Sequence, residues 1–374
     1  MRYRRYGRTD LNLSVFSLGT MRALTDEETF RQTFQRAIAS GINHIETANG
    51  YGASEDYLGR ALQTVDSDVR ARLTVTTKIP PTPDAAAFER QLTRSLQRLQ
   101  TDTIDCVALH GINTWEHLHW ALAYNLPRLA AARADGRVRH VGFSTHAPLD
   151  VVLAAIASDA FAFVELHYYL LFQRQAEAIA RAWERDLGIF IISPADKGGQ
   201  LFFPSEALRA VCAPSAPLTL NYRFLLSDPR ITTLSCGPAT PVELDLPLLV
   251  ADADGPLDHA EQTAIARLDA QLDAKLGSDR CRQCYQCLPC PESIHIPEVL
   301  RLRNLAVGCD LQAFGTYRYG MFERAGHWFP GRRGDRCTDC GDCLPRCPER
   351  LDIPALLRDA HNRLSGPRRR RLWE

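Results

Sequence analysis

The sequence predicts a closed parallel (β/α)8 barrel followed by a smaller, cysteine-rich α-helical unit. Two observations predict the barrel and one predicts the second unit. Eight short apolar runs lie between about residues 15 and 250, and an amphipathic stretch of helical periodicity follows each run. Beyond residue 278 the chain becomes rich in cysteine and proline and has little strand character. At 374 residues the chain is long enough for both parts.

The apolar runs are short and contain β-branched residues, which is typical of buried parallel strands. They cover residues 15–19, 43–47, 73–78, 104–110, 138–144, 161–167, 188–193 and 231–237. Helices are expected over residues 26–40, 54–64, 84–99, 115–135, 148–158, 170–186, 217–226 and 241–250. The opening RYRRYGRTDLNLS predicts a small hairpin before the first strand. A doubly wound sheet is the alternative, but no G-x-G-x-x-G motif supports it.

Charge and hydropathy exclude several classes of function. The formal net charge is zero, which argues against nucleic-acid or anionic-membrane partners. The chain has no run of 18 apolar residues and no signal-peptide pattern, so we expect a cytoplasmic protein. The arginine run at 368–371 is interpreted as a solvated tail. The predicted parts are the barrel (1–257), a bridging helix (258–277), an iron–sulfur domain (278–362) and a basic tail (363–374).

The twelve cysteines are unevenly distributed, and in a reducing cytoplasm clustered cysteines usually bind metal. Cys106, Cys212 and Cys236 are scattered through the barrel region and are expected to be small buried side chains. Cys309 stands apart from the clustered cysteines and is expected to be a free thiol. The clustered ones are Cys281, Cys284, Cys287, Cys290, Cys337, Cys340, Cys343 and Cys347.

These eight cysteines belong to an internal repeat. CRQCYQCLPCPESIHIPEVLR (281–301) aligns with CTDCGDCLPRCPERLDIPALLR (337–358) once one gap is allowed before the fourth cysteine. The second copy has the full bacterial-type [4Fe–4S] spacing, in which the fourth cysteine ligates the other cluster. We therefore expect two clusters, one on Cys281, Cys284, Cys287 and Cys347, and one on Cys337, Cys340, Cys343 and Cys290. Two structural zinc sites are the alternative.

Polar side chains follow the predicted strands at the end where barrel enzymes place their chemistry. Glu46 and Tyr51 follow the second strand, Lys78 ends the third and His110 ends the fourth. Two of the three lysines of the chain, Lys78 and Lys197, fall on this rim. We take these four strand-end residues as candidate catalytic groups.

The barrel region resembles the aldo-keto reductase superfamily. The resemblance rests on GINHIETANGYGASEDYLGRAL (41–62), TTK (76–78) and ALHG (108–111), supported by YRRYGRTDLNLSVFSLGT (3–20) and VGFSTH (141–146). The tail resembles an α-helical ferredoxin domain. Together they look like the iron–sulfur-bearing branch of that superfamily.

The resemblance implies a catalytic tetrad. Tyr51 would protonate a carbonyl oxygen, and Lys78 would lower the pKa of the Tyr51 phenol. Glu46, in place of the family's aspartate, would hold Lys78, and His110 would orient the carbonyl. The nicotinamide contacts look depleted, because Phe163 and Ile192 occupy positions where the family has an amide and an aromatic side chain.

The remaining candidate cofactor-binding residues are Ser144, Ser193, Lys197 and Gly237. Ser144 would meet the carboxamide of a nicotinamide, while Lys197 would meet a substrate carboxylate or phosphate or would be an ordinary loop lysine. Glu243 and Asp245 occupy the family's phosphate-binding segment, where their charges would repel the 2′-phosphate of NADPH. Two [4Fe–4S] clusters are thus the expected cofactors, with NAD(P)H in second place.

Three functions remain open from the sequence. The leading one is an oxidoreductase that acts on a small carbonyl or alcohol and whose clusters exchange electrons with an external carrier such as ferredoxin. The second is an NAD(P)H-dependent aldo-keto reductase with structural or redox-sensing clusters. The third is a non-catalytic, redox-sensing binding protein that keeps the barrel as a scaffold.

Overall fold

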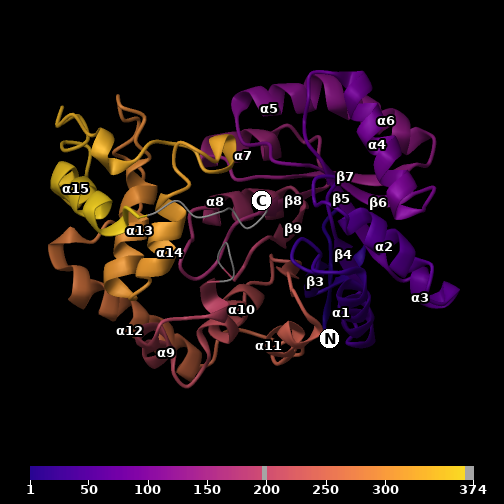
Figure 1. Ribbon diagram of the computed structural model, residues 1–374, viewed down its shortest axis with the longest axis horizontal. Helices are drawn as coiled ribbons and strands as arrows, with labels where there is room; N and C mark the ends of the chain where they lie inside the picture. The colour runs from indigo at the N-terminus through magenta and orange to yellow at the C-terminus, as the bar shows by residue number, and fades with distance from the viewer. Residues whose placement is uncertain (196–199, 367–374) are drawn as a thin grey trace. The chain divides into compact units, whose positions relative to one another are not determined.

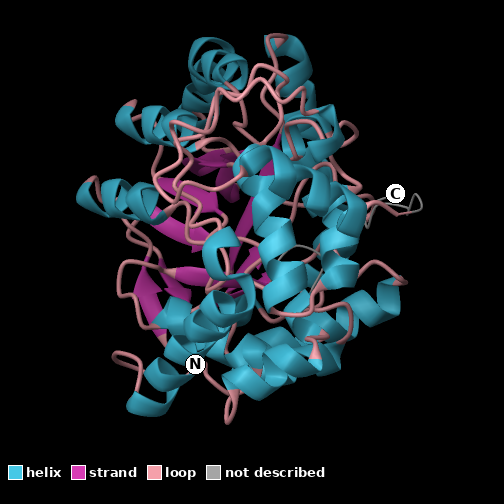
Figure 2. Cartoon of the chain, turned by 90° about the vertical axis from the view of Figure 1, so that its left-hand side faces the viewer, coloured by secondary structure: helices cyan, strands magenta, loops and turns pink. Residues whose placement is uncertain are grey.

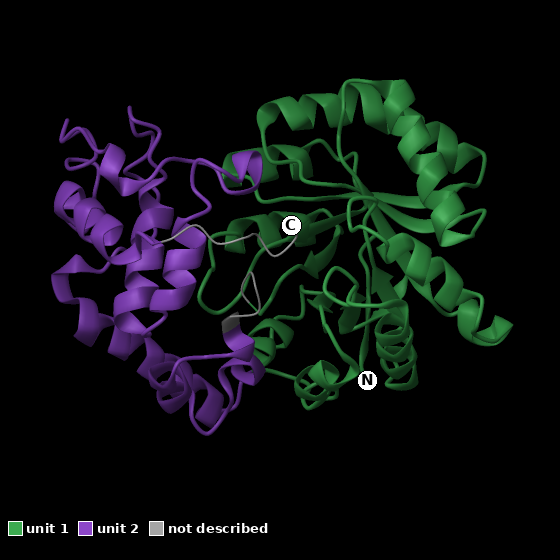
Figure 3. Ribbon diagram, viewed as in Figure 1, with its two compact units in different colours: residues 1–197, 221–256 green, residues 198–220, 257–374 purple. Residues whose placement is uncertain are grey.

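The structure is a computed structural model that describes residues 1–195 and 200–366. The chain divides into two compact units (Figure 3). The barrel unit comprises residues 1–197 and 221–256, and the cysteine-rich unit comprises residues 198–220 and 257–374. Lys197 and the arginines at 368–371 lie outside the described residues. Within the described part of the chain, no helix is both long and apolar enough to span a membrane.

The eight predicted parallel strands are confirmed, and they close into a barrel in the order β10-β3-β4-β5-β6-β7-β8-β9 (Figure 1). A two-stranded antiparallel hairpin of β1 (Tyr3–Arg5) and β2 (Asn12–Ser14) precedes it, as the opening residues predict. The barrel strands are β3 (Phe16–Gly19), β4 (His44–Glu46), β5 (Thr74–Ile79), β6 (Ile104–Leu109), β7 (Val138–Ser144), β8 (Phe163–Leu166), β9 (Gly188–Ile191) and β10 (Thr233–Cys236).

Helices follow the strands and surround the magenta strands of Figure 2. In the barrel unit they are α1 (Glu27–Ala39), α2 (Ser54–Leu62), α3 (Ser67–Arg70), α4 (Ala85–Leu99), α5 (Trp115–Trp120), α6 (Leu126–Ala134), α7 (Leu149–Ala157), α8 (Ala176–Glu184) and α11 (Asp245–Leu248). The helix expected over 115–135 is divided by a π-helical turn at Ala121–Asn125. The one expected over 170–186 begins only at Ala176, after a bridge between Tyr169 and Phe172.

The N-terminal hairpin contributes to the barrel core. Tyr6, just after β1, is fully buried and packs with Phe163 and Phe190 of the barrel strands. Its ring lies over Gly188, where a Cβ atom would come within 2.2 Å of the ring. Only glycine therefore leaves room for Tyr6 at this point. Phe163 is a member of this core cluster.

The cysteine-rich unit is a small helical bundle. Its helices are α9 (Glu206–Cys212), α12 (His259–Leu276), α13 (Ile296–Gly308), α14 (Gln312–Tyr319) and α15 (Ile353–Leu364), and α10 (Pro217–Leu226) leads from it back into the barrel unit. Helix α13 is buried on nearly all sides and packs against α12, α14 and α15. The sequence prediction ran the barrel without interruption to residue 257 and did not anticipate α9, which packs on α12.

Two helix starts in this unit follow from local chemistry. Asp258 accepts a hydrogen bond from the Glu261 amide, and the Glu261 side chain accepts one from the Asp258 amide, which forms a capping box at α12. Proline stands at the first turn of both α13 and α15, where its missing N–H is not needed.

Candidate active site and cysteine centres

The four predicted catalytic residues meet at the carboxyl ends of β4, β5 and β6. Lys78 forms an ion pair with Glu46, and its Nζ lies 5.1 Å from the centre of the Tyr51 ring. The rings of Tyr51 and His110 are in edge-to-face contact with their centres 5.7 Å apart. The barrel thus brings together one acid, one cation, one phenol and one imidazole in adjacent positions.

A fifth residue, Glu165 on β8, was missed by the sequence analysis. Its side chain has no exposed surface, and Oε2 lies 3.3 Å from Lys78 Nζ. Lys78 therefore sits between two carboxylates, those of Glu46 and Glu165. The signal was present in the strand FAFVELH (161–167), where alternation places Phe163, Glu165 and His167 on one face. A glutamate on the interior face of an otherwise apolar strand indicates a buried charge.

Burial governs the electrostatics of this site. It lowers the pKa of Lys78 and raises that of Glu165, and the attraction between the two charges opposes both shifts. The pKa of Tyr51 is raised, first by burial and then by the negative charge of Glu165. The pKa of Tyr51 is therefore raised overall, whereas the sequence analysis expected it to be lowered. A raised pKa keeps the phenol protonated at neutral pH, which suits a proton donor.

Other strand ends contribute polar groups to the same rim. Ser144, at the end of β7, is buried, and its Oγ accepts a hydrogen bond from the Gly111 amide at 3.0 Å. His146 and His167 follow β7 and β8, and their Nε2 atoms are 3.4 Å apart. Ser193 lies half-buried after β9 with a positive φ of 50°. The structure therefore groups two histidines here that the sequence analysis did not pair.

Glu243 and Asp245 do not act as free negative charges. Arg22 donates to Glu243 at 2.8 Å and to the carbonyl oxygen of Gly237 at 2.8 Å. Arg36 forms an ion pair with Asp245. The prediction that Glu243 and Asp245 repel a 2′-phosphate assumed that both carboxylates are unpaired. Because both are paired with arginines, that argument against NADPH loses most of its force.

The two cysteine repeats have the same backbone conformation at matching positions. Left-handed backbone, which non-glycine residues rarely adopt, occurs at three equivalent pairs. These pairs are Gln283 and Asp339, Tyr285 and Gly341, and Ser293 and Arg350, with φ of 61° and 58°, 63° and 80°, and 57° and 53°. The first two pairs place a left-handed turn on each side of the second cysteine, so both loops are wound in the same way.

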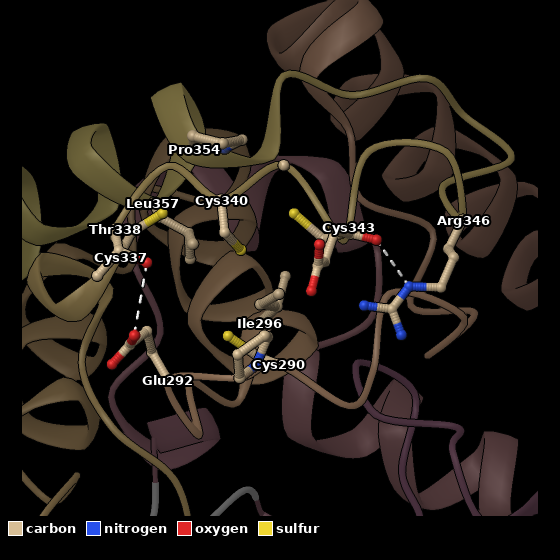
Figure 4. A pocket seen from close by; sticks show the side chains of 13 residues that line it. Cys290, Glu292, Ile296, Cys337, Thr338, Cys340, Cys343, Arg346, Pro354 and Leu357 are labelled. Atoms are coloured by element: carbon tan, nitrogen blue, oxygen red, sulfur yellow. Dashed lines mark hydrogen bonds between the residues drawn. The ribbon is translucent and has the colours of Figure 1, made fainter.

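The fourth cysteine of the first repeat lies with the first three of the second. Cys290, Cys337, Cys340 and Cys343 line one hollow. Figure 4 shows Cys290, Cys340 and Cys343 around its middle, with Ile296, Pro354 and Leu357 among the apolar lining. The shorter spacing before Cys290 does not prevent this residue from reaching the other repeat.

Cys347, the fourth cysteine of the second repeat, lies near a cysteine of the first repeat. Burial raises the pKa of the Cys281 thiol to about 11, and the charges of Cys284 and Cys347 contribute to that rise. Burial likewise raises the pKa of Cys287 to about 12, with contributions from Cys281, Cys284 and Cys343. Cys347 therefore lies near Cys281 of the other repeat, and Cys287 lies near Cys281, Cys284 and Cys343.

Hydrogen bonds brace the cysteine loops against the helices and against each other. Asn304 of α13 donates to the carbonyl oxygen of Cys281 at 2.8 Å. Arg346 donates to the carbonyl oxygens of Asp342 and Pro289, both at 2.9 Å, and so ties the second loop to the first.

Across the described residues, no group of three or more histidine, cysteine, aspartate or glutamate side chains is arranged around a single metal-ion position.

The other cysteines lie where the sequence analysis expects them. Cys106, Cys212, Cys236 and Cys309 are buried, and none is in a disulfide.

The aldo/keto reductase family model matches residues 15–202, half of the chain, and the chain belongs to this family. The match ends before the cysteine repeats.

Similar proteins agree with this assignment. The uncharacterized oxidoreductase YrpG of Bacillus subtilis is 28% identical over 54% of this chain and 68% of its own length. L-galactose dehydrogenase of Arabidopsis thaliana is 29% identical over 40% of this chain and 49% of its own length. Among solved structures, the aldo-keto reductase AKR11C1 from Bacillus halodurans in its holo form superposes with a TM-score of 0.62 at 22% identity, covering 71% of this chain and 96% of that one.

Proposed function

We propose that this aldo/keto reductase interconverts a small carbonyl compound and its alcohol, with Tyr51 as the proton donor. The contact set of Tyr51 carries this proposal, because the phenol lies against the His110 ring and above the Lys78 ammonium. As the carbonyl carbon gains a hydride equivalent, the Tyr51 O–H bond breaks and its proton passes to the carbonyl oxygen. The resulting phenolate is stabilised by the Lys78 ammonium, which Glu46 and Glu165 hold in place.

We further propose that the cysteine-rich unit holds two [4Fe–4S] clusters. The donor set fits, since four thiols from two loops line one hollow, and among the remaining four Cys281 interacts with Cys284, Cys287 and Cys347. Cys290, Cys337, Cys340 and Cys343 would hold one cluster, and Cys281, Cys284, Cys287 and Cys347 the other. When bound, two such clusters would supply one electron each, and these two electrons together with one proton from solvent make up the hydride equivalent that the carbonyl carbon gains, while Tyr51 supplies the second proton to oxygen.

In this proposal an external one-electron carrier such as a ferredoxin exchanges electrons with the clusters, and the protein works in the reducing cytoplasm. A single-turnover experiment tests it. Anaerobic protein is reduced with dithionite, freed of excess reductant and mixed with simple aldehydes, while visible absorbance follows the clusters. Reoxidation with formation of the alcohol supports the proposal, and stable reduced clusters with every aldehyde contradict it.

NAD(P)H-dependent carbonyl reduction is the second candidate. It is favoured by family membership and by the pairing of Glu243 with Arg22, which removes the expected repulsion of NADPH. Fluorescence titration of anaerobic protein with NADH and with NADPH separates the two candidates. Micromolar binding together with aldehyde turnover favours the nicotinamide route, whereas the absence of binding with intact cluster reoxidation favours the carrier route.

A further inference from the structure

Glu165 is a buried acid that lies beside the tetrad without belonging to it. It lies on β8, across the barrel interior from β5, and reaches Lys78 with Oε2 at 3.3 Å. Its other oxygen, Oε1, is buried and has no hydrogen-bond partner among the described residues. We propose that Glu165 is a positioning residue that keeps Lys78 charged beneath Tyr51, so that the site is a pentad rather than a tetrad.

The charges around Lys78 support this role. Glu46 alone would neutralise the ammonium, yet a second carboxylate is also buried beside it. Burying an extra carboxylate is costly, so a fold that needed only to anchor Lys78 gains nothing from Glu165. The titratable groups that face Glu165 and Lys78 inside the barrel are Glu46 and His44 on β4, Tyr51 after β4, Cys106 on β6 and Tyr6 after β1.

The direction of the effect follows from the signs of these charges. Burial lowers the pKa of Lys78, whereas the Glu165 carboxylate raises it. The same carboxylate raises the pKa of Tyr51. Removing the negative charge at residue 165 should therefore lower both pKa values, and both changes move the loss of activity at high pH to a lower pH. If Glu165 acted only by packing, its replacement would leave the pKa values of Lys78 and Tyr51 unchanged.

The composition of the chain offers a direct test, because it has only three lysines: Lys78, Lys197 and Lys275. Protein labelled with ¹³C at the lysine ε-carbon gives three signals whose titration NMR follows, and Lys78→Arg identifies the buried one. In Glu165→Gln we expect the pKa of Lys78 to fall by about 1 pH unit or more. An unchanged Lys78 pKa in a folded Glu165→Gln protein overturns the inference.

A matched control is available in the same barrel unit. Glu55 on α2 is equally buried and accepts a hydrogen bond from Thr77 at 2.6 Å. Its ion-pair partner is Arg98 at 3.6 Å, whereas Lys78 is paired with Glu46 and Glu165. Glu55→Gln should leave the Lys78 titration unchanged, and a fall as large as that in Glu165→Gln counts against a specific role for Glu165.

A second variant keeps the test decisive if Glu165→Gln does not fold. In Glu46→Gln we expect Glu165 to keep Lys78 protonated at pH 7. A Lys78 side chain that is deprotonated at pH 7 in this variant overturns the inference. The inference rests on the proposed role of Tyr51, but the NMR titration needs no substrate. A shifted Lys78 pKa without any carbonyl turnover would disprove the proposed function alone, and turnover with an unshifted pKa would disprove this inference alone.

Discussion

The barrel mouth and the cysteine-rich unit use polar side chains in opposite ways. At the mouth, the charged groups are already paired with one another, as in Glu46, Lys78 and Glu165. In the cysteine-rich unit, thiols held on irregular loops line a hollow. Under the proposed function, the first arrangement would preset charges for proton transfer, and the second would present donor atoms to a bound cluster. The comparison therefore predicts separate effects of substitutions in the two units.

The largest effect is expected when thiols of the cysteine-rich unit are removed. In Cys337→Ala/Cys340→Ala/Cys343→Ala, iron should fall from about eight to about four atoms per chain because one cluster loses three ligands. Adding Cys290→Ala should cost no further iron, since Cys290 belongs to the same centre. Adding Cys347→Ala instead should cost most of the remainder.

Iron analysis and visible absorbance of anaerobically reconstituted protein give the readout. Cys309→Ala is the control, because Cys309 is buried outside the repeats and should keep all the iron. If Cys290→Ala costs more of the remaining iron than Cys347→Ala, the crossed assignment is wrong.

The next largest effect is expected at the mouth. Tyr51→Phe removes the transferable proton and should lower carbonyl turnover about 100-fold or more. Cluster absorbance should be unchanged, because Tyr51 belongs to the barrel unit and the clustered cysteines belong to the cysteine-rich unit. The half-exposed Tyr124→Phe is the control. Equal turnover in Tyr51→Phe and Tyr124→Phe would remove Tyr51 from the mechanism and strengthen the case for a non-catalytic barrel.

The buried polar groups of the barrel also predict a pH dependence of stability. Burial and the Lys78 charge lower the pKa of His44 from its ordinary value of 6.5 to about 3. Its ring is hydrogen-bonded to Ser17 and Thr76 at 2.5 and 2.8 Å. Between these pH values the unfolded chain binds a proton on His44 that the folded chain does not, so the free energy of unfolding should fall as the pH falls from 6.5 toward 3.

The slope attributable to His44 is up to about 1.4 kcal/mol per pH unit. Urea denaturation of wild-type protein and of His44→Asn across this range measures it. The variant should be less stable at pH 7 and should have the shallower slope. Parallel curves for the two proteins would mean that His44 is protonated in the folded state.

The smallest predicted effect concerns the cysteine-rich unit. Asp258→Ala removes the capping box of α12 and should lower the free energy of unfolding of this unit by about 1 kcal/mol. Asp258→Asn, which retains a capping oxygen, should recover most of the loss. Equal unfolding midpoints for Asp258→Ala and the wild type would show that α12 is held by packing alone.

Regular elements were predictable from the sequence, and interactions across the barrel were not. The eight strands and the four tetrad positions follow from apolar runs and from the residues that end them. Glu165 was missed because its partner, Lys78, is 87 positions away in the sequence and becomes a neighbour only when β5 and β8 face each other. The direction of the Tyr51 pKa was misjudged because burial depends on all the strands together.

In the cysteine-rich unit, the repeat was visible from spacing alone. The addition of residues 198–220 to that unit was not, because α9 carries no cysteine and its packing on α12 joins segments far apart in the sequence. Pairing between distant charges, such as Glu243 with Arg22, escaped prediction for the same reason.

Iron and acid-labile sulfide content of anaerobically purified protein, with EPR of the dithionite-reduced form, would determine what the cysteine-rich unit binds. We expect about eight iron and eight sulfide per chain and the signals of two interacting reduced [4Fe–4S] clusters. Two zinc ions per chain with no sulfide and no EPR signal would contradict it. The second result would make the cysteine-rich unit structural and leave electron supply to a nicotinamide.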